Sequence, residues 1–342
     1  MISLQNDYSE GAHPRILTLL SETNRVQSTG YGEDAYCLQA ASYIKQHLQA
    51  PQAAIHFVSG GTQSNTVIIK SMLRPHEAVI AAQSGHIAVH ETGAIEATGH
   101  KVITMPVGND GKLTPEAVHT AVTTHIDEHM VKPRMVYISQ TTEIGSVYSV
   151  AELRALRACC DELGLYLHID GARLGAALAA SSELSLAIMA EVADVFYIGG
   201  TKNGALLGEA IVIVNPDLQA DFRYGMKQHG ALLAKGRILG LQFVGLFAEN
   251  VFFECAAHAH EQAMVLAQGL RDLGCGFLTE PQSNQIFPIL PNKVIAALQE
   301  KFAFYHWQNI NEQDSAVRLV TSWATEPENV NEFLRVTTEL LR

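Results

Sequence analysis

Charged residues and cysteines are both scarce in this chain of 342 residues, and each scarcity excludes a class of function. Charged side chains make up 17% of the sequence, and no local cluster of Lys and Arg offsets the formal net charge of −12. That balance argues against a nucleic-acid partner. The five cysteines are odd in number and form no CxxC pair, so we expect reduced thiols in a cytoplasmic protein.

Long apolar runs are missing as well. No stretch approaches the roughly 18 apolar residues that a bilayer span requires, so we expect no membrane partner. The N-terminus from Met1 to Tyr8 has neither a basic segment nor a long apolar one, and we expect no signal peptide. With 47% apolar residues and no low-complexity segment, the composition is that of an ordinary soluble enzyme.

Short apolar runs alternate with longer amphipathic segments between about residues 53 and 214. This alternation predicts right-handed βαβ units, and therefore an α/β fold with a mostly parallel seven-stranded sheet covered by helices. The expected strands are 54–58, 78–82, 101–105, 135–139, 166–169, 195–198 and 210–214. The expected helices are 14–24, 35–49, 63–73, 87–98, 115–129 and 150–163.

The last hundred residues follow a different pattern. A long apolar helix over 234–253 and a second helix over 256–273 precede strand-like runs at 276–278, 286–290 and 316–321 and a closing helix. This order predicts a small C-terminal α+β domain. We place the large domain at residues 1–245 and the small one at 246–342, with the N-terminal segment 1–25 packing near the small domain.

A lysine and an aspartate each follow an apolar strand-like run. Lys202 lies in the glycine-rich segment GGTKNG (residues 199–204), and Asp170 begins the segment DGARL (residues 170–174). Glycines beside a lysine permit close approach to its backbone, and such a lysine suits a Schiff base with pyridoxal phosphate. An acid at a neighbouring strand end would keep the pyridine nitrogen protonated. A lone glycine-flanked lysine is more often a solvated surface group, so the interpretation depends on the pair.

Two further segments favour the same cofactor. GGTQSN (residues 60–65) follows a strand and opens a helix, where free N–H groups suit a phosphate, although it could also be a simple capped turn. His86 follows the next strand and could stack on a pyridine ring or transfer protons. His86 and His90 are spaced i, i+4 but have no third ligand, so we expect no metal.

Two arginines are candidates for binding a carboxylate. Arg173 lies three residues beyond Asp170, where we expect it to be close to the cofactor and to take part in binding it. Arg318 lies in the last strand-like run, facing away from its apolar neighbours. A guanidinium can hold an amino-acid carboxylate through two parallel hydrogen bonds. The alternative for Arg318 is an ordinary surface position on a strand.

Together, the motifs GGTQSN, GHIAVHETGAIEATGH, DGARL, GGTKNG and AVRLVTSWA, in this order, resemble the threonine aldolase and β-eliminating lyase family. The resemblance covers nearly the whole chain and implies a fold-type-I enzyme that uses pyridoxal 5′-phosphate. It implies that Lys202 binds the cofactor and that Asp170 contacts the pyridine nitrogen. It also implies a homodimer or homotetramer with the active site at the dimer interface. By the same resemblance, Gly61, Thr62 and Gln63 hold the phosphate, His86 stacks on the ring, Arg173 and Arg318 bind the substrate carboxylate, and Tyr31 and Lys235 act across the interface.

The chain departs from the family pattern at two positions. Asn6 stands where threonine aldolases usually have a serine that helps to hold the carboxylate. Glu143, in TTEIG (residues 141–145), stands where the family often has a histidine near the substrate hydroxyl. A buried glutamate with a raised pKa could accept the hydroxyl proton, as could His86.

The resemblance implies aldol cleavage of a small β-hydroxy-α-amino acid, such as L-threonine or L-allo-threonine, to glycine and an aldehyde. Three other functions stay open. The same cofactor could support β-elimination or racemisation through proton removal at Cα by Lys202. The chain could bind pyridoxal phosphate without turnover, although storage needs no carboxylate clamp. A nicotinamide-dependent dehydrogenase is a more distant alternative, because GYGEDA (residues 30–35) follows no strand.

Overall fold

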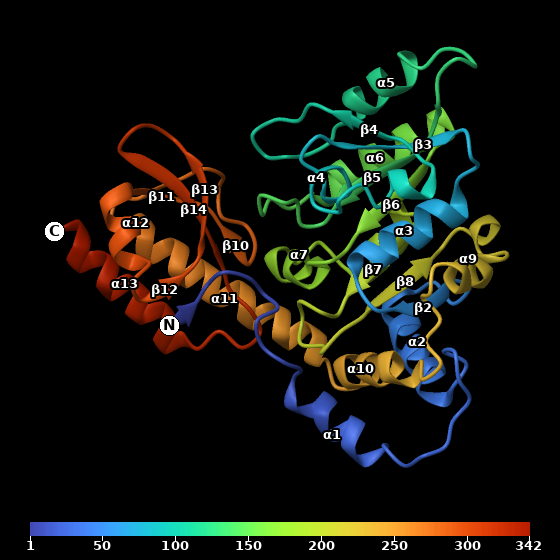
Figure 1. Ribbon diagram of the computed structural model, residues 1–342, viewed down its shortest axis with the longest axis horizontal. Helices are drawn as coiled ribbons and strands as arrows, with labels where there is room; N and C mark the ends of the chain where they lie inside the picture. Colours follow the sequence, from blue (N-terminus) through green and yellow to red (C-terminus); the bar gives the residue numbers. More distant parts are fainter.

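The computed structural model describes every residue from Met1 to Arg342. A large sheet surrounded by helices and a smaller sheet with its own helices lie at opposite ends of the molecule (Figure 1). The large sheet has seven strands in the order β2-β8-β7-β6-β5-β3-β4, and only β8 is antiparallel to its neighbours. Its strands are β2 Ala54–Val58, β3 Glu77–Ala82, β4 Val102–Met105, β5 Lys132–Ser139, β6 Tyr166–Asp170, β7 Val195–Gly199 and β8 Glu209–Ile213. The predicted α/β class and the seven-stranded sheet are confirmed.

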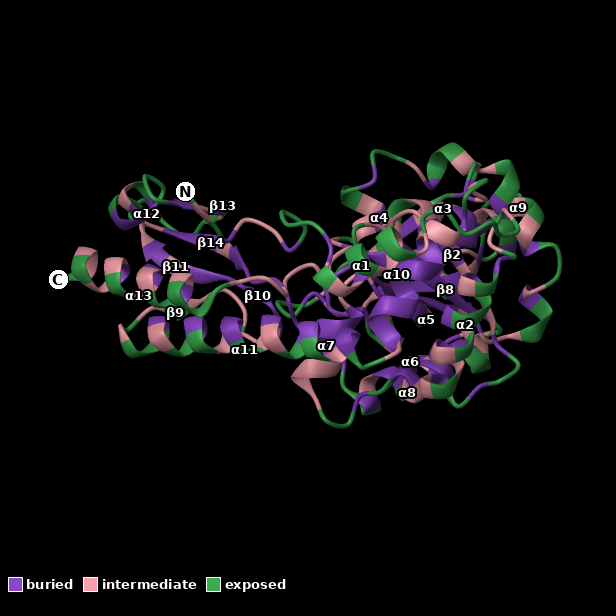
Figure 2. Ribbon diagram, turned by 90° about the horizontal axis from the view of Figure 1, so that it is seen from below, coloured by how far each residue is buried: buried purple, intermediate pink, exposed green.

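Both faces of the large sheet are buried, because its strands alternate apolar side chains between two cores. In β3, for example, Ile80 faces one core of 47 buried residues, whereas Val79 faces a second core of 20. The buried strands fill the centre of this part of the molecule in Figure 2. The helices and 3-10 turns of this part are α1 Pro14–Glu22, α2 Ala35–Leu48, α3 Gly61–Met72, α4 His86–Val89, η1 Glu96–Thr98, α5 Pro115–Thr123, α6 Val150–Leu163, α7 Leu174–Ala180, α8 Leu186–Val192, η2 Pro216–Leu218, α9 Phe222–Gln228 and α10 Arg237–Phe247.

Three predicted helices differ from the structure, and two of them lie between β3 and β5. The single helix expected over 87–98 is instead the four-residue α4 followed by the turn η1, because Thr92 and Gly93 adopt left-handed backbone angles between them. The helix expected over 115–129 already ends at Thr123. Amphipathic spacing therefore overestimated the length of the helix in both segments.

The small part of the molecule brings the two ends of the chain together. Strands β10 Gln285–Ile286, β14 Asp314–Val320, β11 Pro288–Pro291 and β9 Gly276–Phe277 are neighbours in that order, with β13 Tyr305–Asn309 also paired to β14. A separate two-stranded pair joins the N-terminal β1 Ile2–Ser3 to β12 Phe302–Ala303. Helices α11 Val251–Asp272, α12 Asn292–Leu298 and α13 Pro327–Leu341 pack with the sheet around a third core, which includes Leu4.

Helix α11 connects the two parts of the molecule (Figure 2). Its first residues, such as Phe252, belong to the core of the large part, and later residues, such as Leu266, belong to the core of the small part. The long helix expected over 234–253 is broken before α11, where Asn250 adopts a left-handed backbone angle of 61°. No single helix has the length and composition to cross a membrane; α10 and α11 meet that test only as a pair bent by 69°.

Candidate active site

The predicted site residues converge because they follow the carboxyl ends of parallel strands. Helix α3 begins after β2, His86 follows β3, Glu143 follows β5, Asp170 ends β6 and Lys202 follows β7. Parallel strands end at the same edge of their sheet, so five separate segments meet at one place. The small sheet lies on the side of this edge (Figure 1), and residues of β13 and β14 line a cavity together with residues that follow the large strands.

A cavity of about 540 Å³ lies at this edge. Most of the residues that line it are polar, and they come from both parts of the molecule and from the N-terminal segment: Tyr8, His86, His90, Glu143, Arg173, Lys202, Gln285, Tyr305, His306, Trp307 and Arg318. This volume lies in the range of small-molecule sites. Five of the predicted site residues therefore share one cavity.

The ε-amine of Lys202 lies in a buried environment. Burial, together with the nearby positive charge of Arg173, lowers the pKa of Lys202 below its ordinary value. A lysine needs its neutral amine to act as a nucleophile, so this environment activates it. The surrounding glycines are sterically required: a Cβ on Gly199 would lie 2.4 Å from the carbonyl oxygen of Ala172.

The carboxylate of Asp170 is buried and accepts four hydrogen bonds. Asn65 Nδ2 donates to Oδ2 at 3.0 Å, Tyr137 donates to the same oxygen at 2.6 Å, and the Tyr197 hydroxyl donates to Oδ1. The backbone N–H of Ala172 donates to Oδ1 at 3.0 Å. Burial alone would raise the pKa of Asp170, but the electrostatic interaction with His86 and these donors outweigh it and lower the pKa. Asp170 is thus held ionised.

His86 is connected to Asp170 through two buried side chains. Its Nδ1 lies 2.8 Å from Oε1 of Glu91, a residue that is 6% exposed. The same oxygen accepts a hydrogen bond of 2.8 Å from Asn65 Nδ2, which also donates to Asp170. This network fixes the imidazole orientation at the cavity wall.

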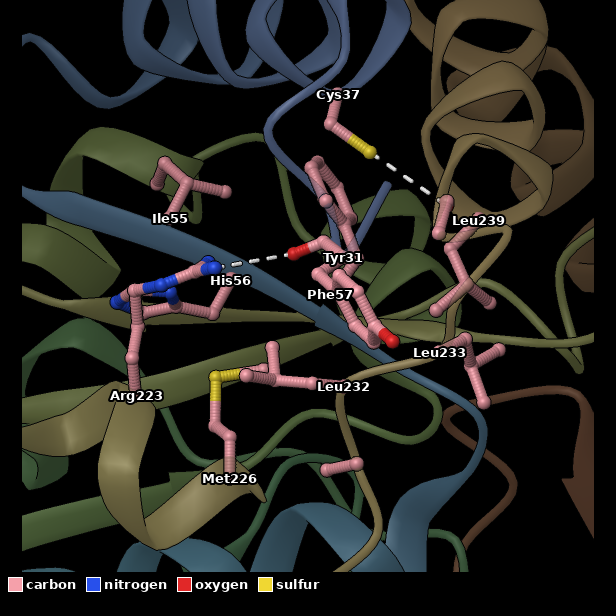
Figure 3. Close-up of a pocket in the computed structure, with 13 residues that line it drawn as sticks. Tyr31, Cys37, Ile55, His56, Phe57, Arg223, Met226, Leu232, Leu233 and Leu239 are labelled. Atoms are coloured by element: carbon pink, nitrogen blue, oxygen red, sulfur yellow. Dashed lines mark hydrogen bonds between the residues drawn. The ribbon is translucent and has the colours of Figure 1, made fainter. Parts of the chain in front are cut away.

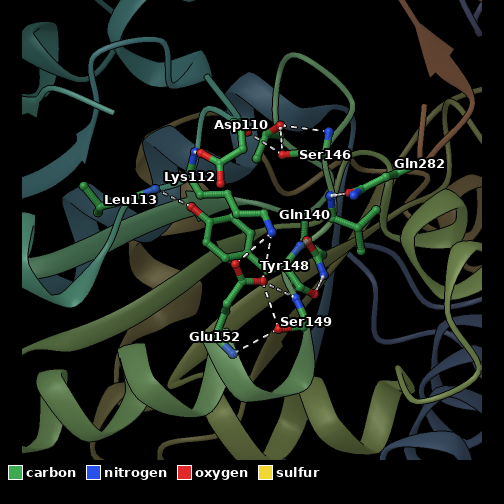
Figure 4. Close-up of polar contacts among 11 residues, drawn as sticks. Asp110, Lys112, Leu113, Gln140, Ser146, Tyr148, Ser149, Glu152 and Gln282 are labelled. Atoms are coloured by element: carbon green, nitrogen blue, oxygen red, sulfur yellow. Dashed lines mark hydrogen bonds and ion pairs between the residues drawn. The ribbon is translucent and has the colours of Figure 1, made fainter. Parts of the chain in front are cut away.

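Glu143 lines the cavity from the loop between β5 and α6. Its Oε1 accepts hydrogen bonds from the backbone N–H of His86 at 2.8 Å and from the Ser139 hydroxyl at 2.6 Å. Burial raises the pKa of Glu143. The loop itself is braced by the side chain of Gln140, whose Oε1 accepts from the N–H of Tyr148 and whose Nε2 donates to the C=O of Tyr148 (Figure 4).

Arg173 is paired with a buried acid of the N-terminal segment. Its Nε and Nη2 donate to the two carboxylate oxygens of Asp7 at 2.7 Å and 3.0 Å. Asn284 Nδ2 adds a third hydrogen bond to Asp7 at 2.9 Å. Burial alone would raise the pKa of Asp7, but the charge of Arg173 outweighs it and lowers the pKa. The guanidinium is therefore fixed in position at the cavity.

Replacing Asp7 with Ala is expected to lower the free energy of unfolding by about 3 kcal/mol, because the largely buried Arg173 loses its counter-charge. Urea-induced unfolding followed by circular dichroism measures the change. Asn6→Ala is the matched control, since the Asn6 side chain bonds only to Tyr8 N and to the Ser9 hydroxyl, within its own turn. Similar small effects of both substitutions would contradict a stabilising role for the ion pair.

Arg318 is held between two aromatic rings of the neighbouring strand. Its guanidinium carbon lies 4.9 Å from the ring centre of Tyr305 and 5.6 Å from that of Trp307. Cation–π contacts orient a guanidinium without consuming its N–H donors. Its Nη2 makes one hydrogen bond of 3.4 Å to the carbonyl of Gln5, and its buried Nε has no partner within the chain. Arg318 thus retains donors for a ligand.

The N-terminus of α3 presents free backbone donors near the site. The backbone N–H of Ser64 bonds to the carbonyl of Gly60, so Gly61, Thr62 and Gln63 precede the first intrahelical bond. The side-chain oxygen of Gln63 accepts from the N–H and hydroxyl of Ser59, which shapes the turn. These N–H groups and the helix dipole suit an anion.

Comparison with known proteins places this site in a family. The β-eliminating lyase family model matches residues 23–292. Low specificity L-threonine aldolase from Pseudomonas aeruginosa is 34% identical over 336 residues, which cover 96% of this chain and 95% of that protein. The chain belongs to the β-eliminating lyase family.

Solved structures similar to this lyase include one of high and one of low sequence identity. The structure of Leishmania major threonine aldolase is 47% identical and covers 100% of both chains, with a TM-score of 0.98. Aspartate aminotransferase from Thermus thermophilus is 16% identical in its complex with maleate, covers 99% of this chain and 91% of that one, and has a TM-score of 0.72. The second similarity shows the fold alone, and together the neighbours confirm the predicted fold type I.

Of the predicted substrate contacts of this lyase, one lies outside the cavity, and several residues around the cavity were not predicted from the sequence. Asn6 does not line the cavity, and its side chain caps its own turn, so this geometry gives no support to a carboxylate contact from Asn6. The neighbouring Tyr8 lines the cavity instead, with its ring centre 6.0 Å from the ε-amine of Lys202. Asp7, Asn65, Glu91 and Tyr137 were also not predicted as site residues, although Asn65 and Glu91 lie within motifs that carry the resemblance.

A second cavity of the lyase lies away from these residues (Figure 3). Its volume is about 30 Å³, near the space of one water molecule, so it cannot hold a cofactor. Arg223 donates to the carbonyl of Tyr31 there at 3.1 Å, and Lys227 lies over the Tyr31 ring. Tyr31 and Lys235 are both exposed and neither lines the larger cavity of this chain.

Proposed function

We propose that this protein is a pyridoxal-phosphate-dependent aldehyde-lyase that cleaves L-threonine and L-allo-threonine to glycine and acetaldehyde. The observation that carries the proposal is the single cavity that joins Lys202, the arginines Arg173 and Arg318, and Glu143. The names of the Pseudomonas and Leishmania relatives support the same reaction. A nucleophilic amine, a carboxylate clamp and a nearby base are the groups that this cleavage needs.

The chemistry of the donor set fits the cofactor. A buried amine of lowered pKa (Lys202), an ionised carboxylate (Asp170) and a helix N-terminus with free N–H groups (Gly61 to Gln63) match its aldehyde, ring nitrogen and phosphate. When bound, pyridoxal phosphate supplies an electron sink for the bond that breaks at Cα. In this proposal Lys202 holds the cofactor, Asp170 keeps its ring protonated, and His86 stacks on its face.

The two arginines would orient the amino acid. Arg173, fixed by Asp7, and Arg318, fixed by its aromatic neighbours, would bind the substrate carboxylate from two sides. Holding the carboxylate decides which bond at Cα stands perpendicular to the ring, and therefore which bond breaks. For aldol cleavage this must be the Cα–Cβ bond.

Replacing Arg318 with Met is expected to raise KM for L-threonine roughly 10- to 100-fold, because a hydrogen bond between charged groups is lost. A smaller change in kcat is expected, since the clamp acts in binding. Steady-state kinetics measure both constants. Arg335→Met is the matched control, because Arg335 forms exposed ion pairs on α13. An unchanged KM in Arg318→Met would remove Arg318 from the carboxylate clamp.

Glu143 is proposed to accept the proton of the substrate β-hydroxyl. Glu143 lines the cavity, and burial raises its pKa toward neutral pH, so that it binds a proton more readily than an exposed glutamate does. His86, whose backbone N–H donates to Glu143, is the second candidate for this proton. Loss of the hydroxyl proton releases the aldehyde as the Cα–Cβ bond breaks.

Product identification distinguishes this reaction from its closest alternative. The family also includes β-eliminating lyases, and the same residues could support β-elimination or racemisation through proton removal at Cα. We expect protein loaded with pyridoxal phosphate to release acetaldehyde and glycine in equal amounts from L-threonine. Pyruvate and ammonia from serine without any aldehyde would favour elimination. Absence of every product would leave the non-catalytic binding protein.

We also propose a homodimer or homotetramer in the cytoplasm. The exposed Tyr31 and Lys235 would complete the active site of a neighbouring subunit, as the family resemblance implies. All five cysteines are free, which suits a reducing compartment. Light scattering of the purified protein measures the oligomeric state.

A further inference from the structure

A continuous path of hydroxyl groups joins Glu143 to Asp170. Ser139 and Tyr137 lie two residues apart on β5, so their side chains point to the same face of the sheet. The Ser139 Oγ lies 2.6 Å from Glu143 Oε1 and 3.2 Å from the Tyr137 hydroxyl oxygen. The Tyr137 hydroxyl lies 2.6 Å from Asp170 Oδ2. The two acids are thereby linked through two hydroxyls.

These three contacts need three hydrogens, and the two hydroxyls supply only two. The Tyr137 hydrogen belongs to Asp170, because an ionised carboxylate is the stronger acceptor. Ser139 then has one hydrogen for two acceptors, Glu143 and Tyr137. When Glu143 is ionised, the Ser139 hydrogen points to it, and the contact between Ser139 and Tyr137 has no hydrogen.

Protonation of Glu143 completes the path. The carboxyl becomes a weaker acceptor, and its own proton can fill the 2.6 Å contact to Ser139. The Ser139 hydrogen is then free to point to Tyr137, so that successive hydroxyls donate toward Asp170. We propose that Ser139 and Tyr137 are positioning residues that couple the proton on Glu143 to the hydrogen bonding of Asp170.

This inference rests on the proposed function for its role in catalysis. When the β-hydroxyl proton moves to Glu143 and the Cα–Cβ bond breaks, no proton leaves Glu143 along the path; the Ser139 hydrogen only changes direction. The Tyr137 oxygen gains a donor, which polarises its own hydrogen bond to Asp170. Asp170, the acid that would hold the pyridine nitrogen, would thereby be stabilised as a carboxylate when Glu143 takes up the proton.

Other titratable groups surround Glu143, so a test must separate their effects. His86 and His90 face it from α4 and the following turn, Asp170 from β6, and Arg173, Lys202 and Arg318 from the cavity wall. Burial of Glu143 and the charge of Asp170 both favour the protonated carboxyl. Tyr197 provides the matched comparison, because it also donates to Asp170 but has no contact with Ser139.

Infrared spectroscopy of the holoenzyme can report the Glu143 proton without any turnover. The C=O stretch of the protonated carboxyl, assigned by its loss in Glu143→Gln, would be followed as the pH is varied. Because no substrate is present, this readout tests the coupling between Glu143 and Asp170 separately from the proposed reaction.

Tyr137→Phe is expected to lower the proton affinity of Glu143 about tenfold, because only the protonated form uses Tyr137 as an acceptor for Ser139. Ser139→Ala is expected to raise it, since the ionised form loses a charge-assisted donor. Ser139→Thr should restore the wild-type value, because the hydroxyl returns. Tyr197→Phe should leave Glu143 unchanged.

Equal shifts in Tyr137→Phe and Tyr197→Phe, or no shift in Tyr137→Phe, would overturn the proposal, because the coupling would then not pass through Ser139. If Tyr137→Phe does not fold, the C–O vibration of Tyr137 in the otherwise unchanged chain serves instead. It should change as Glu143 titrates and should no longer do so in Ser139→Ala. If the Tyr137 vibration changed equally with Glu143 titration in the unchanged chain and in Ser139→Ala, the proposed coupling through Ser139 would also be overturned.

Discussion

Replacing Lys202 with Ala should lower kcat for threonine cleavage by about 10⁶-fold, the scale of loss when a covalently acting residue is removed from its catalytic unit. No other lysine lines the cavity, so no second amine can take its place. The visible absorption of the bound cofactor should also disappear, because that absorption depends on the bond to the ε-amine. Kinetics and an absorbance spectrum on the same sample measure both effects.

Lys301→Ala is the control for this substitution. Lys301 forms an exposed ion pair with Glu332 in the small part of the molecule, so its loss should change neither rate nor spectrum. A Lys202→Ala protein that kept its visible band and its rate within tenfold of wild type would show that another residue binds the cofactor.

Replacing Asp170 with Asn should lower kcat by about 10³-fold or more while the cofactor remains attached through Lys202. The amide is neutral and cannot stabilise a proton on the pyridine nitrogen. The NH₂ group of the new asparagine side chain would also face the donors of Asn65 or Tyr137, which donate to the native carboxylate, so two donors would oppose each other. Loss of rate with retention of a visible band separates this effect from that of Lys202→Ala.

Tyr197→Phe controls for the disturbance of the Asp170 environment. It removes one of the four donors to the carboxylate but keeps the negative charge, so we expect a rate loss of about tenfold. If Asp170→Asn were no slower than Tyr197→Phe, the charge of Asp170 would not be essential.

Much of the fold followed from the sequence because local pattern and global topology agree in the large sheet. Every expected strand there, from 54–58 to 210–214, has a counterpart, since buried parallel strands are continuous apolar runs between helices. Residues that follow such strands, such as Asp170 and Lys202, could be grouped because parallel strands end at one edge. The domain boundary near residue 245 stays a prediction, because α11 packs into both cores.

The supporting residues could not be predicted in the same way. Asp7 meets Arg173 across 166 positions of sequence, and Asn65 meets Asp170 across 105. No periodicity reports such pairs, because each depends on how separate segments pack. The interruptions of the expected helices after α4 and before α11 were not predicted for a related reason. Thr92 and Asn250 adopt left-handed backbone angles there, and their residue types indicate such angles only weakly.

The most direct test of the account is a crystal structure of the protein with pyridoxal phosphate and glycine. It should show the cofactor between His86 and the strand ends, with its ring nitrogen at Asp170 and its phosphate at the N-terminus of α3. The glycine carboxylate should contact Arg173 and Arg318. A cofactor bound elsewhere, or a glycine carboxylate turned away from both arginines, would contradict the proposed reaction site.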